Sequence, residues 1–303
     1  MTRRAAAAVI TGASGFIGGA MCRELEKRGF SVTGVTRRPV MEAEFPVRVI
    51  DYSIDSVARL VSELRPSVLF HAVGTASVAG SIADPERDFA SSVLMFQHVL
   101  EGVRRSGVPC RVVFPSSAAV YGNPETLPVA ESAARRPISP YGHNKAICEI
   151  LASAYGTCFG VPSLVLRIFS MFGPAQRNLL VWDLFRKFRD DPEVFLDGTG
   201  EEARDFIHVE DFAAQAMLAI ERTTATHAVL NVGAGLSVTV LQVAQRIGAL
   251  LGSSKPVRFT GRQRPGDPLA WRADLSAFEA LGGAPVVLDF EARIGEVLLQ
   301  WRG

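Results

Sequence analysis

The sequence predicts an α/β protein with a doubly wound parallel sheet and a smaller C-terminal domain. Two observations lead to this prediction: short apolar runs recur over the first 170 residues, and amphipathic helical patterns separate them. Strands that alternate with helices form βαβ units, and the resulting parallel sheet is covered by helices on both faces. Beyond residue 170 the pattern becomes irregular and rich in turns.

Six apolar runs, each bounded by glycine, proline or polar residues, predict buried strands. They cover residues 5–10, 31–35, 47–50, 67–70, 111–114 and 163–168. Apolar residues at helical spacing predict helices between them, around Val57, Leu60, Val61 and Leu64, around Phe89, Val93, Phe96 and Leu100, and around Ile147, Ile150, Leu151 and Ala154. Two later helices are predicted over residues 179–189 and 240–251.

Composition excludes several classes of function. The 303 residues include 32 basic and 31 acidic side chains, for a net charge of +1, so neither a nucleic-acid partner nor a membrane surface is expected. No apolar segment approaches the length of a membrane span. The four cysteines lack CxxC spacing and a nearby histidine cluster, which predicts buried reduced thiols in a cytoplasmic protein and no metal site.

A glycine-rich turn, "TGASGFIG", follows the first predicted strand and opens a helix. Its glycines suit a tight turn and close approach of the backbone to a pyrophosphate, which free amides at the helix start would bind. A plain strand-to-helix turn is the alternative. This pattern predicts an NAD(P)-binding Rossmann domain over residues 1–170, with part of 204–250 packing back on it, and a mainly substrate-binding domain over 171–303. The expected dinucleotide-binding residues are Gly12, Ser14, Gly15, Phe16, Ile17 and Gly18.

The ends of the next two strands bear on the choice of dinucleotide. NAD-preferring sites usually carry an acidic residue there for the ribose 2′-hydroxyl, whereas this sequence has Arg37 and Arg38. Guanidinium groups fit a 2′-phosphate, which favours NADP over NAD as the cofactor; a solvated surface pair is the alternative. Asp51 ends the third strand and is placed to accept from an adenine amino group, or else to cap the following helix.

Tyr141 and Lys145 stand at positions i and i+4, hence on one helical face. A free tyrosine ionises near pH 10, and a neighbouring ammonium favours the phenolate and makes proton transfer feasible. The pair alone is common on surface helices. Its specificity comes from the glycine turn upstream and from two serines, Ser116 and Ser117, at the end of the strand between them.

Taken together, these motifs resemble the extended short-chain dehydrogenase/reductases, in the branch of nucleotide-sugar epimerases, dehydratases and reductases that includes UDP-glucose 4-epimerase. The resemblance spans nearly the whole chain and rests on "TGASGFIG", "SSAAVYG", "SPYGHNK", "LDGTGEEARDFIHVEDFA" and "RPGDP". It implies an enzyme of carbohydrate biosynthesis that acts on a nucleoside-diphosphate sugar, and a homodimer formed through the helices at 89–100 and 141–159.

The resemblance also implies roles for individual residues. Ser117 matches the catalytic hydroxyl that bonds the reacting sugar oxygen, Tyr141 matches the acid/base, and Lys145 matches the residue that binds the nicotinamide ribose and favours the phenolate. Ser116 is expected to bond the backbone or to line the same pocket, and Tyr121 to be a packing residue. The substrate side is expected to include Asn178, Leu179, Arg204, Arg264, Asp267 and Trp271, the last beside sugar C2.

Three functions remain open at this point. The arginine pair favours an NADPH-dependent 4-keto-sugar-nucleotide reductase, while the C-terminal motifs resemble those of an NAD-dependent 4-epimerase of a UDP-hexose. The third is a non-catalytic NADP-binding regulatory protein. The intact set of catalytic residues argues against it: Ser117, Tyr141 and Lys145. Dehydration is not expected, because Ala118 and Ala119 stand where 4,6-dehydratases carry an acidic pair.

Overall fold

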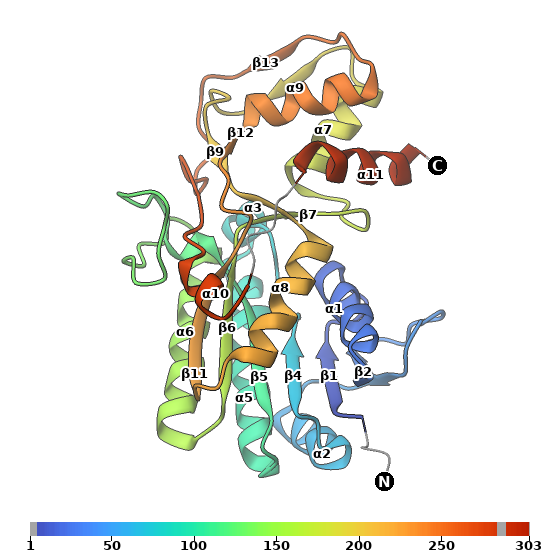
Figure 1. The fold of residues 1–303 in the computed structure, drawn as a ribbon, viewed down its shortest axis with the longest axis vertical. Coiled ribbons are helices and arrows are strands. Elements are labelled where there is room, and N and C mark those ends of the chain that lie inside the picture. Colours follow the sequence, from blue (N-terminus) through green and yellow to red (C-terminus); the bar gives the residue numbers. More distant parts are fainter. Residues whose placement is uncertain (1–4, 284–288, 303) are drawn as a thin grey trace.

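A seven-stranded parallel sheet forms the centre of the protein (Figure 1). The structure is a computed structural model, and it describes residues 5–283 and 289–302. Its strand order is β11-β6-β5-β4-β1-β2-β3, with every neighbouring pair parallel. The strands are β1 (Ala7–Thr11), β2 (Ser31–Thr36), β3 (Val47–Val49), β4 (Val68–His71), β5 (Arg111–Ser117), β6 (Ser163–Ile168) and β11 (His227–Val232). The predicted Rossmann-type doubly wound sheet is therefore confirmed.

All six predicted strands are present, and β5 extends three residues beyond the predicted end, to Ser117. The seventh strand, β11, was not predicted, because its sequence HAVLNV interrupts the apolar run with polar residues. It pairs with β6 along its full length, from His227 opposite Ser163 to Val232 opposite Ile168. Residues well beyond 170 thus complete the sheet.

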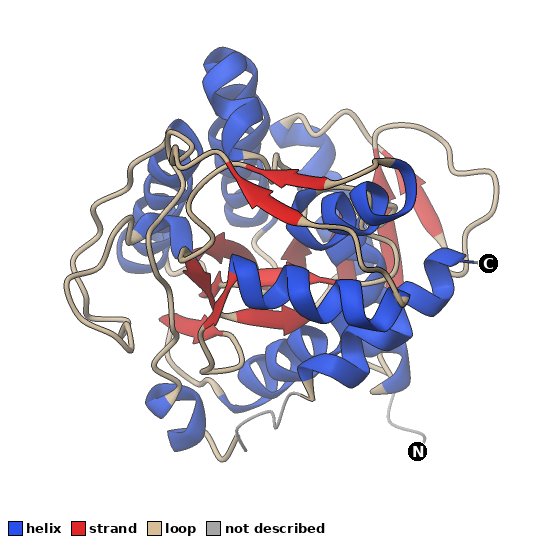
Figure 2. Cartoon of the chain, turned by 90° about the horizontal axis from the view of Figure 1, so that it is seen from above, coloured by secondary structure: helices blue, strands red, loops and turns tan. Residues whose placement is uncertain are grey.

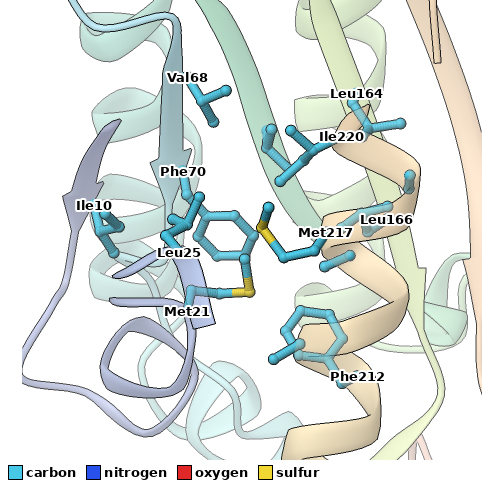
Figure 3. Close-up of a cluster of buried hydrophobic side chains, with 14 of the residues drawn as sticks. Ile10, Met21, Leu25, Val68, Phe70, Leu164, Leu166, Phe212, Met217 and Ile220 are labelled. Atoms are coloured by element: carbon cyan, nitrogen blue, oxygen red, sulfur yellow. The ribbon is translucent and has the colours of Figure 1, made fainter. Parts of the chain in front are cut away.

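Helices cover both faces of the sheet. On one face lie α1 (Phe16–Lys27) and α8 (Val209–Arg222), and Figure 3 shows their side chains meeting those of the strands. Met21 and Leu25 of α1 and Met217 of α8 surround Phe70 of β4, all of them buried. On the other face α2 (Ile54–Leu64), α5 (Met95–Ser106) and α6 (Pro140–Phe159) enclose a second apolar cluster.

The C-terminal part lies over one end of the sheet, as the view from above shows (Figure 2). It contains α7 (Leu179–Asp190), α9 (Val240–Leu251) and α11 (Phe290–Arg302), which share an apolar cluster of their own. Short strand pairs join its segments to one another: β7 (Ser170–Phe172) with β10 (Phe206–His208), β9 (Ala203–Arg204) with β12 (Val238–Thr239), and β8 (Val194–Leu196) with β13 (Val257–Phe259). The predicted helices over 179–189 and 240–251 are confirmed.

The short helical segments lie around the carboxyl ends of β4 and β5. After β4 come α3 (Val78–Ala83), α4 (Pro85–Phe89) and a π-helical turn η1 (Ala90–Leu94), which runs directly into α5. After β5 comes the 3₁₀ turn η2 (Ala118–Val120). One further short helix, α10 (Ser276–Ala280), lies against β11 instead. None of the helices in the described residues is both long and apolar enough to cross a membrane.

Three cysteines, Cys22, Cys110 and Cys148, are buried as free thiols, and burial raises the pKa of each to about 12. The prediction of four buried thiols is wrong for Cys158, which is exposed near the end of α6. The described residues contain no group of three or more histidines, cysteines or acidic residues that could hold a metal ion.

Candidate active site

A cavity of about 1080 Å³ lies between the carboxyl edge of the sheet and the C-terminal part. The strand order reverses between β1 and β4, and in open α/β sheets ligands bind in the crevice at such a point. Most of the predicted site residues line this one cavity: Phe16, Ile17, Ser116, Ser117, Tyr141, Lys145, Asn178, Leu179, Arg204, Arg264, Asp267 and Trp271. The fold therefore brings together residues that span more than 250 positions of the sequence.

The glycine-rich turn leaves no room for side chains. Gly12 has a φ of 68°, and a Cβ there would come within 2.8 Å of the Ala72 carbonyl oxygen. A Cβ on Gly18 would come within 2.1 Å of the Gly12 oxygen, so α1 packs directly on the turn. In the described structure α1 begins without a side-chain cap or an acidic residue in its first turn, which leaves its amides available to an anion.

Arg37, Arg38 and Asp51 lie at the ends of β2 and β3, outside the residues that line the cavity. The Arg37 guanidinium lies 5.9 Å from the ring centroid of Tyr52 and donates to Met95 Sδ at 3.3 Å. Arg38 is exposed. Both guanidiniums thus sit beside the strand end where the adenosine half of a dinucleotide is expected.

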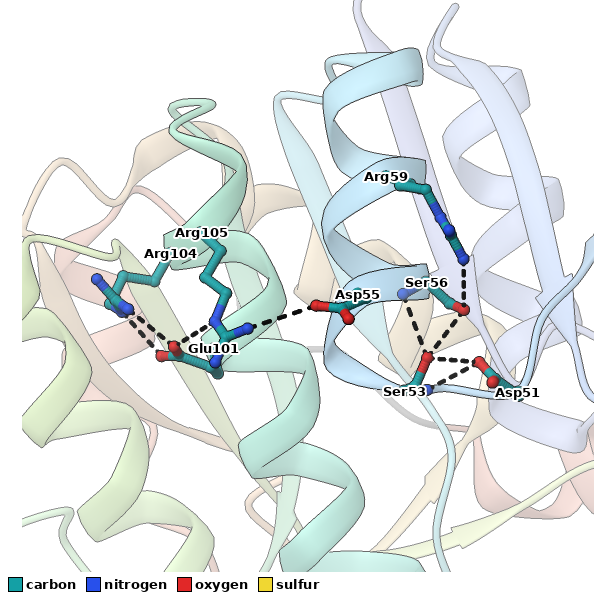
Figure 4. A network of polar contacts seen from close by, with 8 residues as sticks. All are labelled: Asp51, Ser53, Asp55, Ser56, Arg59, Glu101, Arg104 and Arg105. Atoms are coloured by element: carbon teal, nitrogen blue, oxygen red, sulfur yellow. Dashed lines mark hydrogen bonds and ion pairs between the residues drawn. The ribbon is translucent and has the colours of Figure 1, made fainter.

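Asp51 supports the start of α2 (Figure 4). Its Oδ1 accepts from the backbone nitrogen of Ser53 at 3.0 Å and from the Ser53 hydroxyl at 2.9 Å, and Ser53 in turn caps the helix. Hydrogen bonds from the Ser56 and Ser53 hydroxyls and the Ser53 amide lower the pKa of Asp51 to about 2. The capping alternative is therefore realised through Ser53, while the second carboxylate oxygen of exposed Asp51 stays available to a ligand.

Ser117 ends β5 and begins η2. Its Oγ accepts from the Ala119 amide at 3.2 Å, so its own proton remains free to be donated. Neighbouring Ser116 is buried, and its hydroxyl donates to Glu149 Oε1 at 2.6 Å rather than to backbone. Ser117 is thus the serine whose hydroxyl is free at the cavity.

Tyr141 and Lys145 occupy the first turns of α6. Ser139 caps this helix, and Pro140 occupies its first position, which is the arrangement that fixes a helix start. The buried Lys145 ammonium donates to the Pro115 carbonyl at 2.7 Å and lies 5.8 Å from the ring centroid of Tyr141. The structure therefore places the ammonium beside both the phenol and the end of β5.

On the substrate side, Trp271 is held rigidly. Its Nε1 donates to the Gly122 carbonyl at 2.9 Å, and its ring packs edge-on against Phe169. The guanidinium of Arg204 lies over the indole, 5.5 Å from its centroid, and burial lowers the pKa of this arginine. Trp271 and Arg204 thus form one fixed wall of the cavity.

The remaining predicted substrate residues lie at the rim. Arg264 pairs with Asp197 at 2.6 Å, and burial raises the pKa of Asp267. Asn178 precedes α7, and Leu179 has a φ of 64°, a conformation that non-glycine residues rarely adopt. Backbone strain of this kind is concentrated at ligand sites.

Comparison with known proteins identifies the family to which the chain belongs. Residues 8–233 match the family model described as "NAD dependent epimerase/dehydratase family". The chain belongs to this family.

Curated relatives of the chain are consistent with this family. A UDP-glucose 4-epimerase of Azospirillum brasilense is 29% identical over 86% of this chain and 81% of its own length. A UDP-glucose 4-epimerase of Corynebacterium glutamicum is 28% identical over 93% of this chain and 91% of its own length.

Solved structures of the family superpose over nearly the whole chain. MoeE5 in complex with UDP-glucose and NAD has a TM-score of 0.87 at 29% identity, covering 97% of this chain and 98% of its own. The UDP-glucose 4-epimerase of Thermus thermophilus in complex with NAD has a TM-score of 0.88 at 28% identity, covering 98% and 99%. The protein is thus an NAD(P)-dependent nucleotide-sugar enzyme of the extended short-chain dehydrogenase/reductase type.

A nicotinamide dinucleotide fits the residues present. The turn at Gly12 and Gly18 is a cradle that a Cβ would fill, and the uncapped start of α1 offers amides to a pyrophosphate. NAD is the dinucleotide in the family's description and in the two solved complexes named above. The preference for NADP that the arginine pair predicts is not confirmed by these comparisons.

A buried ion pair beneath the site was not predicted from the sequence. Glu149 of α6 pairs with Arg167 of β6 at 2.7 Å, with only 2% and 5% of their side chains exposed. Glu149 also accepts from Ser116, and Arg167 donates to the Tyr121 hydroxyl at 2.9 Å. Tyr121 is itself buried and donates to Asn231 Oδ1 at 2.7 Å, which confirms it as a packing residue. This network joins the floor of the cavity to three strands of the sheet.

Proposed function

We propose that the protein is a dinucleotide-dependent 4-epimerase of a UDP-hexose. The observation that carries this proposal is the convergence of Ser117, Tyr141 and Lys145 with Arg204 and Trp271 around one cavity. The curated relatives named above are UDP-glucose 4-epimerases. Together these findings favour the epimerase over the reductase that the arginine pair suggests.

The side chains divide the acid–base work. The Ser117 hydroxyl donates to the sugar oxygen at C4, and Tyr141 removes the proton from that oxygen and later returns it. Lys145 places its ammonium beside the phenol, where it attracts the negative charge that develops on Tyr141 during proton transfer. When bound, the dinucleotide supplies the hydride acceptor and donor at C4.

Dehydration is disfavoured by the residues that follow Ser117. Ala118 and Ala119 are both buried, and neither offers a group that could remove or add a proton. Elimination of water needs an acid and a base on the sugar. Hydride chemistry at C4 is what the remaining side chains support.

The second candidate function is the NADPH-dependent 4-keto-sugar-nucleotide reductase, favoured by Arg37 and Arg38 at the end of β2. Replacing both arginines by alanine is expected to weaken NADP binding about tenfold or more while changing NAD binding less than twofold, because only NADP carries a 2′-phosphate. Calorimetric titration of both dinucleotides into protein freed of any dinucleotide that it retains measures this. Arg48→Ala on β3, which loses an exposed pair with Glu63, is the control. Equal losses for the two dinucleotides would contradict the assignment.

Trp271 is proposed to exclude bulky substituents at sugar C2. Trp271→Ala is expected to raise the ratio of kcat/KM for UDP-N-acetylglucosamine to that for UDP-glucose about tenfold, since the rigid indole wall is removed. Trp271→Phe keeps an aromatic ring there and should leave the ratio nearly unchanged. If the alanine variant keeps the wild-type ratio, Trp271 does not set specificity.

A homodimer is proposed through the outer face of α6 and the segment before α5. This surface exposes several large apolar side chains: Phe89, Leu94, Ile147, Ile150 and Phe159. Exposed apolar residues on neighbouring helices are typical of an interface. Light scattering coupled to size exclusion should give a mass near twice that of the chain, and Ile150→Glu should shift it toward the monomer.

The proposed function is tested by denaturing the purified protein and identifying any dinucleotide released. An epimerase that returns the hydride to the same sugar retains its dinucleotide, so a near-stoichiometric amount of NAD is expected. A protein that releases no dinucleotide, and that oxidises added NADPH with a 4-keto-6-deoxy sugar nucleotide, would instead be the reductase.

A further inference from the structure

Besides Glu149, another buried carboxylate, that of Asp88, lies next to the turn of α6 that bears Tyr141 and Lys145. Asp88 belongs to α4 and is only 1% exposed. Both its oxygens accept hydrogen bonds from neutral donors: the Asn144 side-chain amide at 2.7 Å and the Thr75 hydroxyl. Both oxygens of the buried carboxylate are thus engaged by neighbouring side chains.

The partners of Asp88 connect two walls of the site. Asn144 directly precedes Lys145 and lies one turn after Tyr141, and it is itself buried. Thr75 lines the cavity, in the loop between β4 and α3. A parallel tie comes from Ser81 of α3, whose buried Oγ accepts from the Tyr141 backbone nitrogen at 3.0 Å. Two hydrogen bonds thus hold the first turns of α6 against the α3–α4 segment, one from Asn144 to Asp88 and one from the Tyr141 backbone to Ser81.

We propose that Asp88 is a positioning residue that fixes the turn bearing Tyr141 and Lys145 through Asn144 and supplies a buried negative charge beside that turn. This inference rests on the proposed acid–base role of Tyr141. It adds a residue from a different element, one that does not line the cavity, to the set that controls the proton transfer.

The charged and titratable groups around Asp88 determine what its charge does. From α6 these are Tyr141, Lys145, Cys148 and Glu149, while α3 and η1 bring none and Glu86 and Arg87 of α4 are exposed. The Cys148 thiol, whose pKa burial raises to about 12, is acted on by both Lys145, which lowers its pKa, and Asp88, which raises it. Lys145 and Asp88 thus act on the same thiol with opposite sign, and removing the negative charge of Asp88 favours the deprotonated form of the groups near it.

Asp88→Asn retains the shape of the side chain and removes its charge. The ionisation of Tyr141, followed by ultraviolet absorbance at 295 nm as the step that is absent after Tyr141→Phe, is expected to move to lower pH, because a nearby negative charge is removed. Burial raises the pKa of Tyr52 and Tyr121 to about 12 and raises that of Tyr155, which keeps these phenols away from neutral pH. The pH profile of kcat/KM should move in the same direction, with kcat lowered about tenfold.

Asp84→Asn is the matched control. Asp84 is the exposed N-cap of the same helix, its carboxylate accepts from the Arg87 amide at 3.0 Å, and asparagine caps equally well. Its pH profile and turnover should match the wild type. The titration of Tyr141 needs no turnover, so it tests Asp88 even if the protein is not an epimerase.

Asn144→Ala removes the hydrogen bond from the Asn144 amide to Asp88 and leaves the Asp88 carboxylate in place. It is expected to lower kcat several-fold while shifting the Tyr141 ionisation less than Asp88→Asn does. Wild-type ionisation and turnover in folded Asp88→Asn would overturn the proposal. If circular dichroism shows Asp88→Asn unfolded, wild-type kcat in Asn144→Ala overturns it instead.

Discussion

Tyr141→Phe is expected to lower turnover about a thousandfold while dinucleotide affinity stays within twofold of the wild type. The phenol is the group placed to move the proton of the C4 hydroxyl, and a positioned acid–base group contributes about two to four orders of magnitude to the rate. The ring remains, so packing at the start of α6 and its tie to Ser81 through the backbone are retained. Initial rates with UDP-galactose measure turnover, and calorimetry with NAD, on protein first freed of any dinucleotide that it retains, measures affinity.

Tyr155→Phe is the control for this variant. Tyr155 lies on the same helix, but its hydroxyl bonds Gln97 and Glu101 on the side of α5, and it does not line the cavity. Its turnover should stay within about twofold of the wild type. A Tyr141→Phe enzyme of nearly normal turnover would contradict the proposed mechanism.

Glu149→Ala is expected to reduce the free energy of unfolding by about 3–5 kcal/mol, because it leaves the Arg167 guanidinium buried without its charge partner. Ser116 would lose the acceptor of its hydroxyl at the same time. Urea denaturation followed by circular dichroism measures the change. The effect is large because both side chains are almost wholly removed from solvent.

Glu63→Ala provides the comparison on the surface. Glu63 pairs with Arg48 at 2.6 Å, but more than half of each side chain is exposed, and such pairs contribute at most about 1 kcal/mol. A Glu149→Ala loss as small as the Glu63→Ala loss would show that the buried pair does not stabilise the fold. The double replacement of Glu149 and Arg167 by methionine should recover part of the loss.

The sequence was informative wherever chemistry depends on neighbouring residues. Tyr141 and Lys145 lie four apart on one helix, and Ser117 ends a strand, so their meeting at the carboxyl edge follows from local spacing and from the parallel sheet. The glycine turn is equally local. These residues needed no knowledge of how distant segments pack.

The orientation of α6 could not be derived in this way. Its periodicity groups Ile147 and Ile150 on one face, yet these side chains are 37% and 55% exposed, while Lys145 and Glu149 are buried. Periodicity predicts which residues share a face, but not which face turns to the sheet. The partners of the buried groups lie in other elements, Arg167 on β6 and Asp88 on α4, so their pairing became visible only in three dimensions.

The epimerase proposal is tested most directly with UDP-galactose carrying deuterium at C4 and no added dinucleotide. We expect interconversion to UDP-glucose with the deuterium retained at C4, because the hydride that leaves this carbon returns to the opposite face of the same sugar. The result that would contradict the proposal is a protein that leaves UDP-galactose unchanged under these conditions and reacts with a 4-keto sugar nucleotide only when NADPH is supplied.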